Sequence, residues 1–218
     1  LKSVAASPTR FVALTDDVGK VLISEDGDNW AEVDTYTDQE LEEVIYANDR
    51  FLAVGEAGTI TTSADGLNWT PDQVANRIDY YGVARRGDLL VAAGDAGNIL
   101  TSTTGRAWMY RPTPTTRNLH AVHYANGLFV ASGRKGALIT SPDGVVWTSR
   151  ASGVDSYLER IHWADGLWVA VGEQGDMTTS TNGLTWTPLN TGTTPLTDHE
   201  GVAYGNGLWV AAGGYFEY

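Results

Sequence analysis

Short apolar runs, separated by Gly, Asn and Asp, recur along the whole chain. Typical examples are Phe51-Leu-Ala-Val-Gly55, Leu90-Val-Ala-Ala-Gly94, Phe129-Val-Ala-Ser-Gly133 and Trp168-Val-Ala-Val-Gly172. No apolar spacing of three to four residues is sustained over ten or more positions, so helices are not expected. Runs rich in β-branched and aromatic residues, bounded by turn-forming residues, predict short strands joined by tight turns.

A seven-residue pattern of the form Ser-x-Asp-Gly-x-x-Trp recurs at a fixed period. Its copies span Ser24–Trp30, Ser63–Trp69, Ser102–Trp108, Ser141–Trp147 and Ser180–Trp186, so that successive Trp residues are 39 positions apart. Five copies at one period indicate a repeat architecture in which each repeat is one small structural unit.

Each repeat offers four short strands. In the second repeat we place them at about 42–46, 51–54, 59–62 and from 69 onward. One four-stranded antiparallel unit cannot bury both of its faces, whereas units stacked around an axis can, and this predicts an all-β propeller. We expect a single domain over 1–218, with repeats at about 1–39, 40–78, 79–117, 118–156, 157–196 and a partial repeat at 197–218.

The number of blades is less simple than the number of Trp-containing turns. The segment Gly201–Gly213 begins a sixth repeat, and the N-terminal segments Lys2–Ala6 and Arg10–Leu14 already supply the first two strands of the first repeat. Six pairs of first and second strands therefore stand against five pairs of third and fourth strands. We predict six blades with an incomplete last blade, and the alternative is a five-bladed ring with a displaced terminal hairpin.

The repeated turn is interpreted as structural. Its Asp can accept backbone N–H groups inside the turn, its Gly adopts a conformation denied to other residues, and its Trp brings a large apolar surface to pack between sheets. The residues assigned to this role are Asp26, Trp30, Asp65, Trp69, Trp108, Asp143, Trp147, Asn182 and Trp186. Thr104 replaces the Asp in the third copy, and we expect the weakest turn there.

These turns resemble the Asp-box, or bacterial-neuraminidase, repeat. That repeat occurs in sialidases, sortilin-type receptors, some glycoside hydrolases and the photosystem II assembly-factor propellers. The resemblance covers essentially the whole chain, and it implies a β-propeller whose Asp-box turns lie away from the ligand face. It says little about function, because one fold serves many functions.

One rim of the predicted propeller is variable. Antiparallel order places the second-to-third-strand turns and the links between repeats on that rim, and the links run through 33–39, 71–79, 110–118, 149–157 and 188–199. Variable loops on a constant scaffold more often carry function. The candidate ligand-binding residues on this rim are Tyr36, Asp38, Arg77, Tyr80, Tyr110, Arg111, Arg117, Arg134, Arg150, Asp155 and Tyr157.

Charge and composition exclude several classes of partner. The formal net charge is −13, which repels phosphate backbones, so no nucleic-acid partner is expected. The absence of Cys excludes disulfides and thiolate chemistry. No apolar run approaches membrane-spanning length, so membrane insertion is not expected. The chain begins at Leu1, which we interpret as a processed or trimmed N-terminus.

Neither a metal nor a cofactor is expected. His120 and His123 are three apart on a predicted strand and point to opposite faces, so they do not chelate one ion. His123 and His162 hold equivalent positions in adjacent repeats, and packing or hydrogen bonding on the inner strand is the favoured interpretation. No calcium loop, phosphate-binding loop or nucleophile elbow occurs.

Catalysis is not the favoured interpretation. A sialidase needs an arginine cluster, a Tyr/Glu pair and an acid, and the family's Arg-Ile-Pro segment is absent; the nearest strings are Arg77-Ile-Asp79 and Arg160-Ile-His162. A hydrolase using two carboxylates, such as Glu43 with Glu159 or Glu200, remains an alternative.

The sequence favours a non-catalytic recognition propeller that binds a carbohydrate or a cell-surface receptor through the variable rim. The host is expected to be a secreted bacterial adhesion protein or a phage tail, placing the chain outside the cell or on a virion surface. The first alternative is a protein-binding assembly scaffold, and the second is a sialidase-like glycoside hydrolase. The oligomeric state is left open, with a trimer expected only if the chain belongs to a fibre.

Overall fold

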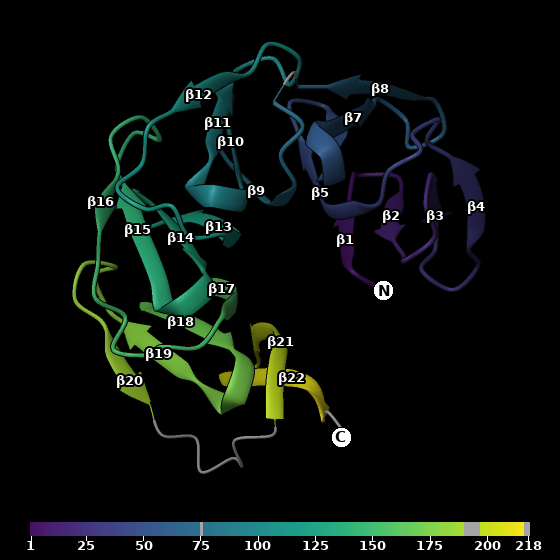
Figure 1. The fold of residues 1–218 in the computed structure, drawn as a ribbon. Coiled ribbons are helices and arrows are strands. Elements are labelled where there is room, and N and C mark those ends of the chain that lie inside the picture. Colours follow the sequence, from purple (N-terminus) through teal and green to yellow (C-terminus); the bar gives the residue numbers. More distant parts are fainter. Residues whose placement is uncertain (75, 190–196, 216–218) are drawn as a thin grey trace. The chain divides into compact units, whose positions relative to one another are not determined.

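The computed structural model describes residues 1–74, 76–189 and 197–215, with the backbone alone described at positions 72, 73, 197 and 215. The fold is a β-propeller of five four-stranded antiparallel blades followed by a two-stranded sixth blade (Figure 1). This confirms the predicted fold class and the incomplete last blade. The strands of each blade lie within one predicted repeat.

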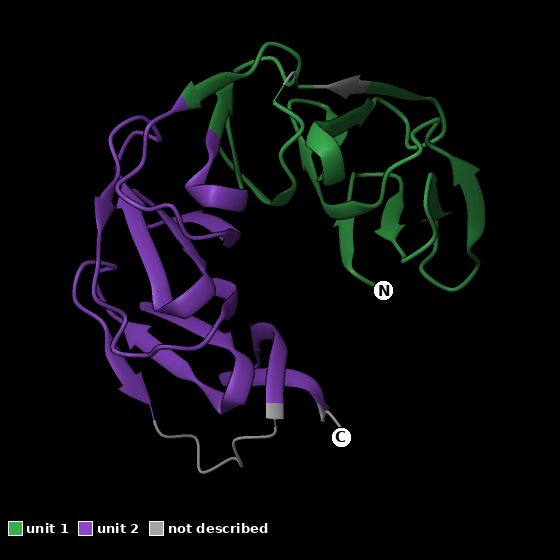
Figure 2. Ribbon diagram, viewed as in Figure 1, with its two compact units in different colours: residues 1–94, 100–110 green, residues 95–99, 111–218 purple. Residues whose placement is uncertain are grey.

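The chain divides into two compact units, which are described separately (Figure 2). Unit 1 comprises Leu1–Gly94 and Leu100–Tyr110, and unit 2 comprises Asp95–Ile99 and Arg111–Tyr218.

The strands of the first three blades follow one another in sheet order. Blade 1 holds β1 (Ser3–Ala6), β2 (Phe11–Leu14), β3 (Lys20–Ser24) and β4 (Ala31–Asp34). Blade 2 holds β5 (Leu41–Ala47), β6 (Arg50–Gly55), β7 (Thr59–Ser63) and β8 (Trp69–Gln73). Blade 3 holds β9 (Tyr80–Arg86), β10 (Leu89–Gly94), β11 (Ile99–Ser102) and β12 (Met109–Arg111).

The remaining blades repeat this order until the sixth. Blade 4 holds β13 (Leu119–Ala125), β14 (Leu128–Gly133), β15 (Ala137–Ser141) and β16 (Thr148–Ser149). Blade 5 holds β17 (Leu158–Ala164), β18 (Leu167–Gly172), β19 (Met177–Ser180) and β20 (Thr187–Leu189). Blade 6 holds β21 (Thr197–Gly205) and β22 (Leu208–Tyr215), and β21 lies against β17 and β18. The last hairpin is therefore stacked as a sixth blade.

Apolar side chains from neighbouring blades meet in separate cores. In unit 1, Val12 and Leu14 of blade 1 pack with Phe51 and Trp69 of blade 2. In unit 2, Leu138 of blade 4 packs with the blade 5 residues Leu158, Trp168, Ile161 and Trp186. In unit 1, blade 2 thus packs against blade 1 through Phe51 and Trp69 and against blade 3 through Leu52 and Val54. This is how a four-stranded unit buries both of its faces.

A single turn of 3-10 helix joins the second and third strands in four blades. These turns are η1 (Glu56–Gly58), η2 (Asp95–Gly97), η3 (Arg134–Gly136) and η4 (Glu173–Gly175). Each has a non-glycine residue at positive φ followed by a glycine; in η3 these are Lys135 at 53° and Gly136 at 63°. A Cβ on Gly136 would lie 1.9 Å from the Val154 carbonyl oxygen of the following link, so only glycine fits this close approach.

The Ser-x-Asp-Gly-x-x-Trp turns are held by the hydrogen bonds that their residue types allow. In the second copy, Asp65 Oδ1 accepts the N–H groups of Leu67 and Asn68 at 2.9 and 2.8 Å, and Ser63 Oγ accepts that of Gly66 at 2.8 Å. The indole Nε1–H of Trp69 donates to the Gly66 carbonyl at 2.9 Å. These side chains accept the backbone N–H groups of the turn, which would otherwise bond to a neighbouring strand.

The third copy has longer bonds. Thr104 Oγ1 accepts the N–H groups of Arg106 and Ala107 at 3.3 and 3.4 Å, where the second copy's carboxylate has 2.9 and 2.8 Å. A hydroxyl is also a weaker acceptor than a carboxylate. This geometry agrees with the expectation of a weaker turn at Thr104.

Candidate functional site

The turns η1, η2 and η4 are tied to the first strand of the next blade by one recurring hydrogen bond. Asp79 Oδ1 accepts the N–H of Ala57 at 2.8 Å, Asn118 Oδ1 that of Ala96 at 3.1 Å, and Asp198 Oδ1 that of Gln174 at 2.9 Å. Each acceptor immediately precedes a buried residue in the first strand of the next blade, namely Tyr80, Leu119 or His199. A short acid or amide at that position therefore fastens each turn.

The junction between blades 4 and 5 departs from this rule. Tyr157 occupies the position of the acid or amide, and the turn beside it carries Arg134 and Lys135. The Arg134 guanidinium lies over the Tyr157 ring, 5.4 Å from the ring centroid. At this junction a cation and an aromatic ring thus stand where a side-chain oxygen accepts a turn N–H at the three junctions described above.

Three further side chains complete this cluster. The His120 ring meets the Tyr157 ring edge-on, with centroids 5.1 Å apart. His120 Nδ1 lies 3.4 Å from Glu159 Oε2, and Arg117 Nη1 donates to the Lys135 carbonyl at 2.6 Å. We call Arg117, His120, Arg134, Tyr157 and Glu159 the Tyr157 cluster. All of it lies in unit 2.

Electrostatics within the cluster keep its acid ionised. Burial alone would raise the pKa of Glu159, but the His120 hydrogen bond and the charges of His120 and Arg160 lower it overall. Nearby, burial raises the pKa of Glu173, and the charges of Glu159 and Asp198 raise it further. Arg117, Arg134 and Lys135 are exposed, so three cations point to solvent on a chain of net charge −13.

Other predicted site residues are dispersed. Tyr36, Asp38 and Arg77 are exposed on links in unit 1, and Tyr110 is exposed in the middle of β12. In unit 2, Asp155 is exposed, Arg111 is half-buried, and Arg150 Nε donates to Thr140 Oγ1 at 3.0 Å on its own blade. Of the predicted set, the structure brings together Arg117, Arg134 and Tyr157. Part of the last predicted link, residues 190–196, lies outside the described residues.

Tyr80 requires a correction. Its side chain is fully buried in the core of blades 2 and 3, and its hydroxyl accepts a hydrogen bond from Asn76 Nδ2 at 2.7 Å. It occupies the position held by Leu41, Leu119 and Leu158 in other blades. Tyr80 therefore packs in the core and holds the side chain of Asn76 in the preceding link, and it has no exposed surface for direct ligand contact.

His120 and Glu159 were not predicted as ligand-binding residues. They are 39 positions apart, and both sit at the irregular step near the start of the first strand, between Leu119 and Ala121 and between Leu158 and Arg160. Such bulges redirect a side chain out of the regular ladder. The 39-residue spacing of His120 and Glu159 could have indicated that they occupy the same repeat position, but the sequence did not predict the bulge.

His123 and His162 pack between blades, as the favoured interpretation held. Their ring centroids are 5.2 Å apart, and the Trp168 ring meets His123 edge-on at 5.8 Å. Burial, with a smaller contribution from His162, lowers the pKa of His123 to about 4. Both rings are thus neutral near pH 7, since burial also lowers the pKa of His162.

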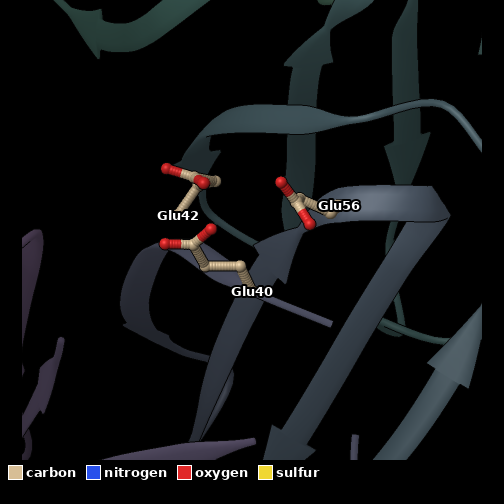
Figure 3. Close-up of side chains that lie close together, drawn as sticks. All are labelled: Glu40, Glu42 and Glu56. Atoms are coloured by element: carbon tan, nitrogen blue, oxygen red, sulfur yellow. The ribbon is translucent and has the colours of Figure 1, made fainter. Parts of the chain in front are cut away.

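One group of three carboxylates in the described residues has the spacing of metal ligands. Oxygen atoms of Glu40, Glu42 and Glu56 lie within 4.8 Å of one another (Figure 3). Lys2 Nζ lies 2.6 Å from Glu40 Oε1 and 2.8 Å from Glu42 Oε1, so a cation of the chain itself already partners two of the three acids. Burial lowers the pKa of Lys2, but these two acids more than offset it and raise the pKa overall.

Two of the three carboxylates considered for hydrolysis, Glu43 and Glu159, have structural contacts. Glu43 Oε2 accepts the Val83 N–H at 2.5 Å, which links blade 2 to blade 3.

No helix among the described residues has the length and apolar character needed to cross a membrane.

Comparison with known proteins identifies the architecture. No protein-family model matches the chain, and no curated protein sequence matches it. Among solved structures, YCF48 from Cyanidioschyzon merolae is similar with a TM-score of 0.72 at 17% identity, over 96% of this chain and 78% of YCF48. YCF48 bound to D1 peptide gives 0.71 at 16% identity, over 97% and 73% of the two chains. The computationally designed Ika8 protein gives 0.69 at 14% identity, over 98% and 68%. At these identities the likeness shows a shared β-propeller fold.

Proposed function

We propose that this chain is a non-catalytic, protein-binding propeller that takes a polypeptide segment on the Tyr157 cluster. The observation that carries the proposal is the junction between blades 4 and 5, where Tyr157 and Arg134 replace the acid-to-turn bond found at three other junctions. The solved complex of a similar propeller with a peptide supports this class of partner over a carbohydrate.

The chemistry of the cluster favours a segment with acidic side chains. Arg117, Arg134 and Lys135 are exposed, and arginine binds carboxylates with strong, charge-assisted hydrogen bonds. Tyr157 adds a flat, half-buried apolar surface next to these cations. Aromatic and arginine side chains together are typical of the residues that dominate binding energy at protein interfaces.

The test is a selection of random peptides on the immobilised full chain, followed by affinity measurement. We expect enrichment of peptides with Asp or Glu. Their affinity should fall about tenfold to a hundredfold in Arg134→Ala and in Tyr157→Ala, since each lost contact of this kind is worth about 1.5–3 kcal/mol.

Arg106→Ala is the matched control, because Arg106 is also an exposed arginine but belongs to unit 1, in the turn between β11 and β12, and is not part of the cluster. Its affinity should match the wild type. Peptides that bind all three variants equally well, glycans that bind and lose affinity in Tyr157→Ala, or turnover of a glycoside would each contradict the proposal.

A further inference from the structure

The turn η1 uses all three of its backbone N–H groups. Those of its first and third residues donate to backbone carbonyls, at 3.0 Å to Glu40 and at 2.8 Å to Ile78. The middle N–H, that of Ala57, donates to the side-chain oxygen Asp79 Oδ1 at 2.8 Å. The middle N–H takes a side-chain oxygen in η2 and η4 as well.

The turn η3 keeps the two outer bonds and lacks the middle one. Its first and third N–H groups donate to the carbonyls of Asn118 and Ser156 at 2.9 and 2.6 Å. The middle N–H, that of Lys135, has no hydrogen-bond acceptor within the part of the chain that the structure describes. Tyr157 stands at the link position that Asp79 holds beside η1, so an aromatic ring takes the place of the accepting carboxylate.

Neighbouring side chains do not replace the missing acceptor. Ser156 Oγ, one residue before Tyr157, donates instead to Asp176 Oδ2 at 2.6 Å. Lys135 is exposed, so an acceptor from outside the chain can reach its N–H. The unused donor lies inside the Tyr157 cluster, since the carbonyl of the same residue accepts Arg117 Nη1 at 2.6 Å.

The occupants of the equivalent N–H groups indicate what this donor binds. They are two carboxylates and one amide, from Asp79, Asp198 and Asn118. The charge beside η3 decides between these two groups. Of the four turns, η3 alone carries cations, and the other three begin with an acid. A carboxylate gains charge-assisted bonds from arginine that an amide does not, so the carboxylate is favoured.

We propose that the Lys135 N–H accepts a side-chain carboxylate of the bound polypeptide as its hydrogen-bond partner, with Arg117 and Arg134 beside that carboxylate. This inference rests on the proposed function and assigns the atom that fixes the acidic segment. An Asp or Glu of the partner then does for η3 what Asp79 does for η1. The interface thereby reproduces a contact that the repeat already uses between its own blades.

The first experiment follows the backbone amides of the full chain by NMR during titration with N-acetyl-aspartate methylamide. We expect a saturable downfield shift of the Lys135 amide proton. The amides of Ala57, Ala96 and Gln174 are internal controls and should not move, because their acceptors are in place. N-acetyl-asparagine methylamide should bind at least about tenfold more weakly, since charge-assisted bonds are about twice as strong as neutral ones. Tighter binding of N-acetylglycine would reassign the site to a chain-end carboxylate and overturn the side-chain assignment.

The second experiment removes the donor alone. A backbone amide-to-ester substitution at Lys135 deletes the N–H and keeps the side chain. The acidic peptides selected above should bind this protein about tenfold to a hundredfold more weakly than the wild type. The same ester at Gln174 is the matched control, because it deletes the donor to Asp198 outside the cluster. It should leave peptide affinity unchanged and lower stability in urea more than the ester at Lys135, whose N–H has no bond to lose.

A side-chain variant tests the same donor without an ester. Tyr157→Asn places at this junction the residue type that accepts the Ala96 N–H from Asn118 at 3.1 Å. The new amide should occupy the Lys135 N–H, so the aspartate probe should no longer shift it. In Tyr157→Ala, which offers no acceptor, the shift should persist.

The outcomes separate this inference from the proposed function. A Lys135 amide that does not respond to the probe, or full peptide affinity in the ester at Lys135, would overturn the inference. The proposed function would stand in that case if the peptides still depended on Arg134 and Tyr157. A responding amide together with peptides that ignore Arg134 would remove the proposed function and leave the carboxylate site in place.

Discussion

Replacement of His123 should remove a large part of the protein's sensitivity to mild acid. His123 lies on β13, where its ring packs against His162 of β17 and Trp168 of β18. Burial and, to a smaller extent, the charge of His162 lower its pKa from 6.5 to about 4. Ile45 holds the same repeat position in blade 2, so His123→Ile replaces the imidazole with a side chain the repeat already accommodates.

The sign follows from the depressed pKa. The folded protein keeps His123 neutral while the unfolded chain binds a proton below about pH 6.5, so folding is favoured fully above that pH and less as the pH falls toward 4. A depression of this size corresponds to a loss of about 3 kcal/mol once the pH is well below 4, and about 2 kcal/mol of it has gone by pH 5. His162, whose pKa is also lowered by burial, adds a loss of the same sign.

Carboxylates do not obscure this pH window. The pKa values of Asp26 and Asp65 are lowered by hydrogen bonds within their turns, and that of Glu159 by His120 against the opposing effect of burial. A lowered carboxyl pKa contributes stability that is lost only as the pH falls below the unfolded value near 4. Burial and neighbouring acids raise the pKa values of Glu56 and Glu173, but these groups are present in both proteins, so the difference between the wild type and His123→Ile from pH 7.5 to 5 reports on His123.

Urea denaturation followed by Trp fluorescence at pH 7.5, 6 and 5 provides the assay. The free energy of unfolding of the wild type should fall over this range by about 2 kcal/mol more than that of His123→Ile. Equal losses in the two proteins would refute the reasoning, because they would show that His123 is protonated in the folded state at little cost.

Three further substitutions test the scaffold, each by the free energy of unfolding in urea. Thr104→Asp should stabilise the protein by about 1 kcal/mol, because a carboxylate replaces a hydroxyl whose bonds are 3.3 and 3.4 Å long; no gain would contradict the structural interpretation of the turn. Gly133→Ala should destabilise it by about 1–3 kcal/mol, because the new Cβ would lie 2.0 Å from the Asn118 carbonyl oxygen, and a neutral effect would mean that β13 yields there. Trp69→Ala should cost about 3–5 kcal/mol and Trp30→Ala less than half of that, since Trp69 is 5% exposed and Trp30 is 40% exposed; equal costs would show that Trp30 is covered.

The fold could be predicted because the same pattern of strands and turns occurs in every repeat. Apolar runs and turn residues located the strands of the second repeat to within one or two residues, as the bounds of β5 and β6 show. The incomplete sixth blade followed from counting strand pairs. A local pattern repeated at one spacing fixes local structure, and stacking is then the remaining way to bury the faces.

The candidate site was predicted only in part, because burial inside a link depends on tertiary packing. Tyr80 and Tyr157 look alike in sequence, each at the end of a link, but they differ by one position in the repeat. Tyr80 takes the buried place of Leu158, while Tyr157 takes the half-exposed place of Asp79. A shift of one residue moves a side chain to the opposite face of a strand. Because the links differ in sequence from repeat to repeat, the sequence does not show at which residue the next strand begins.

The energetic balance at the junction of blades 4 and 5 explains why its departure from the repeat points to binding. At the other junctions a side-chain oxygen accepts a turn N–H, a bond worth about 1 kcal/mol to stability. The contact of Arg134 with the Tyr157 ring contributes a similar stability, since a cation on an aromatic ring near solvent is worth about 0.5–1 kcal/mol. The exchange is therefore nearly neutral for folding. What it changes is the surface: a carboxylate turned into the protein is replaced by an aromatic ring and cations turned toward solvent. A change that leaves stability almost untouched and rebuilds the exposed chemistry is what a binding site on a repeat scaffold requires.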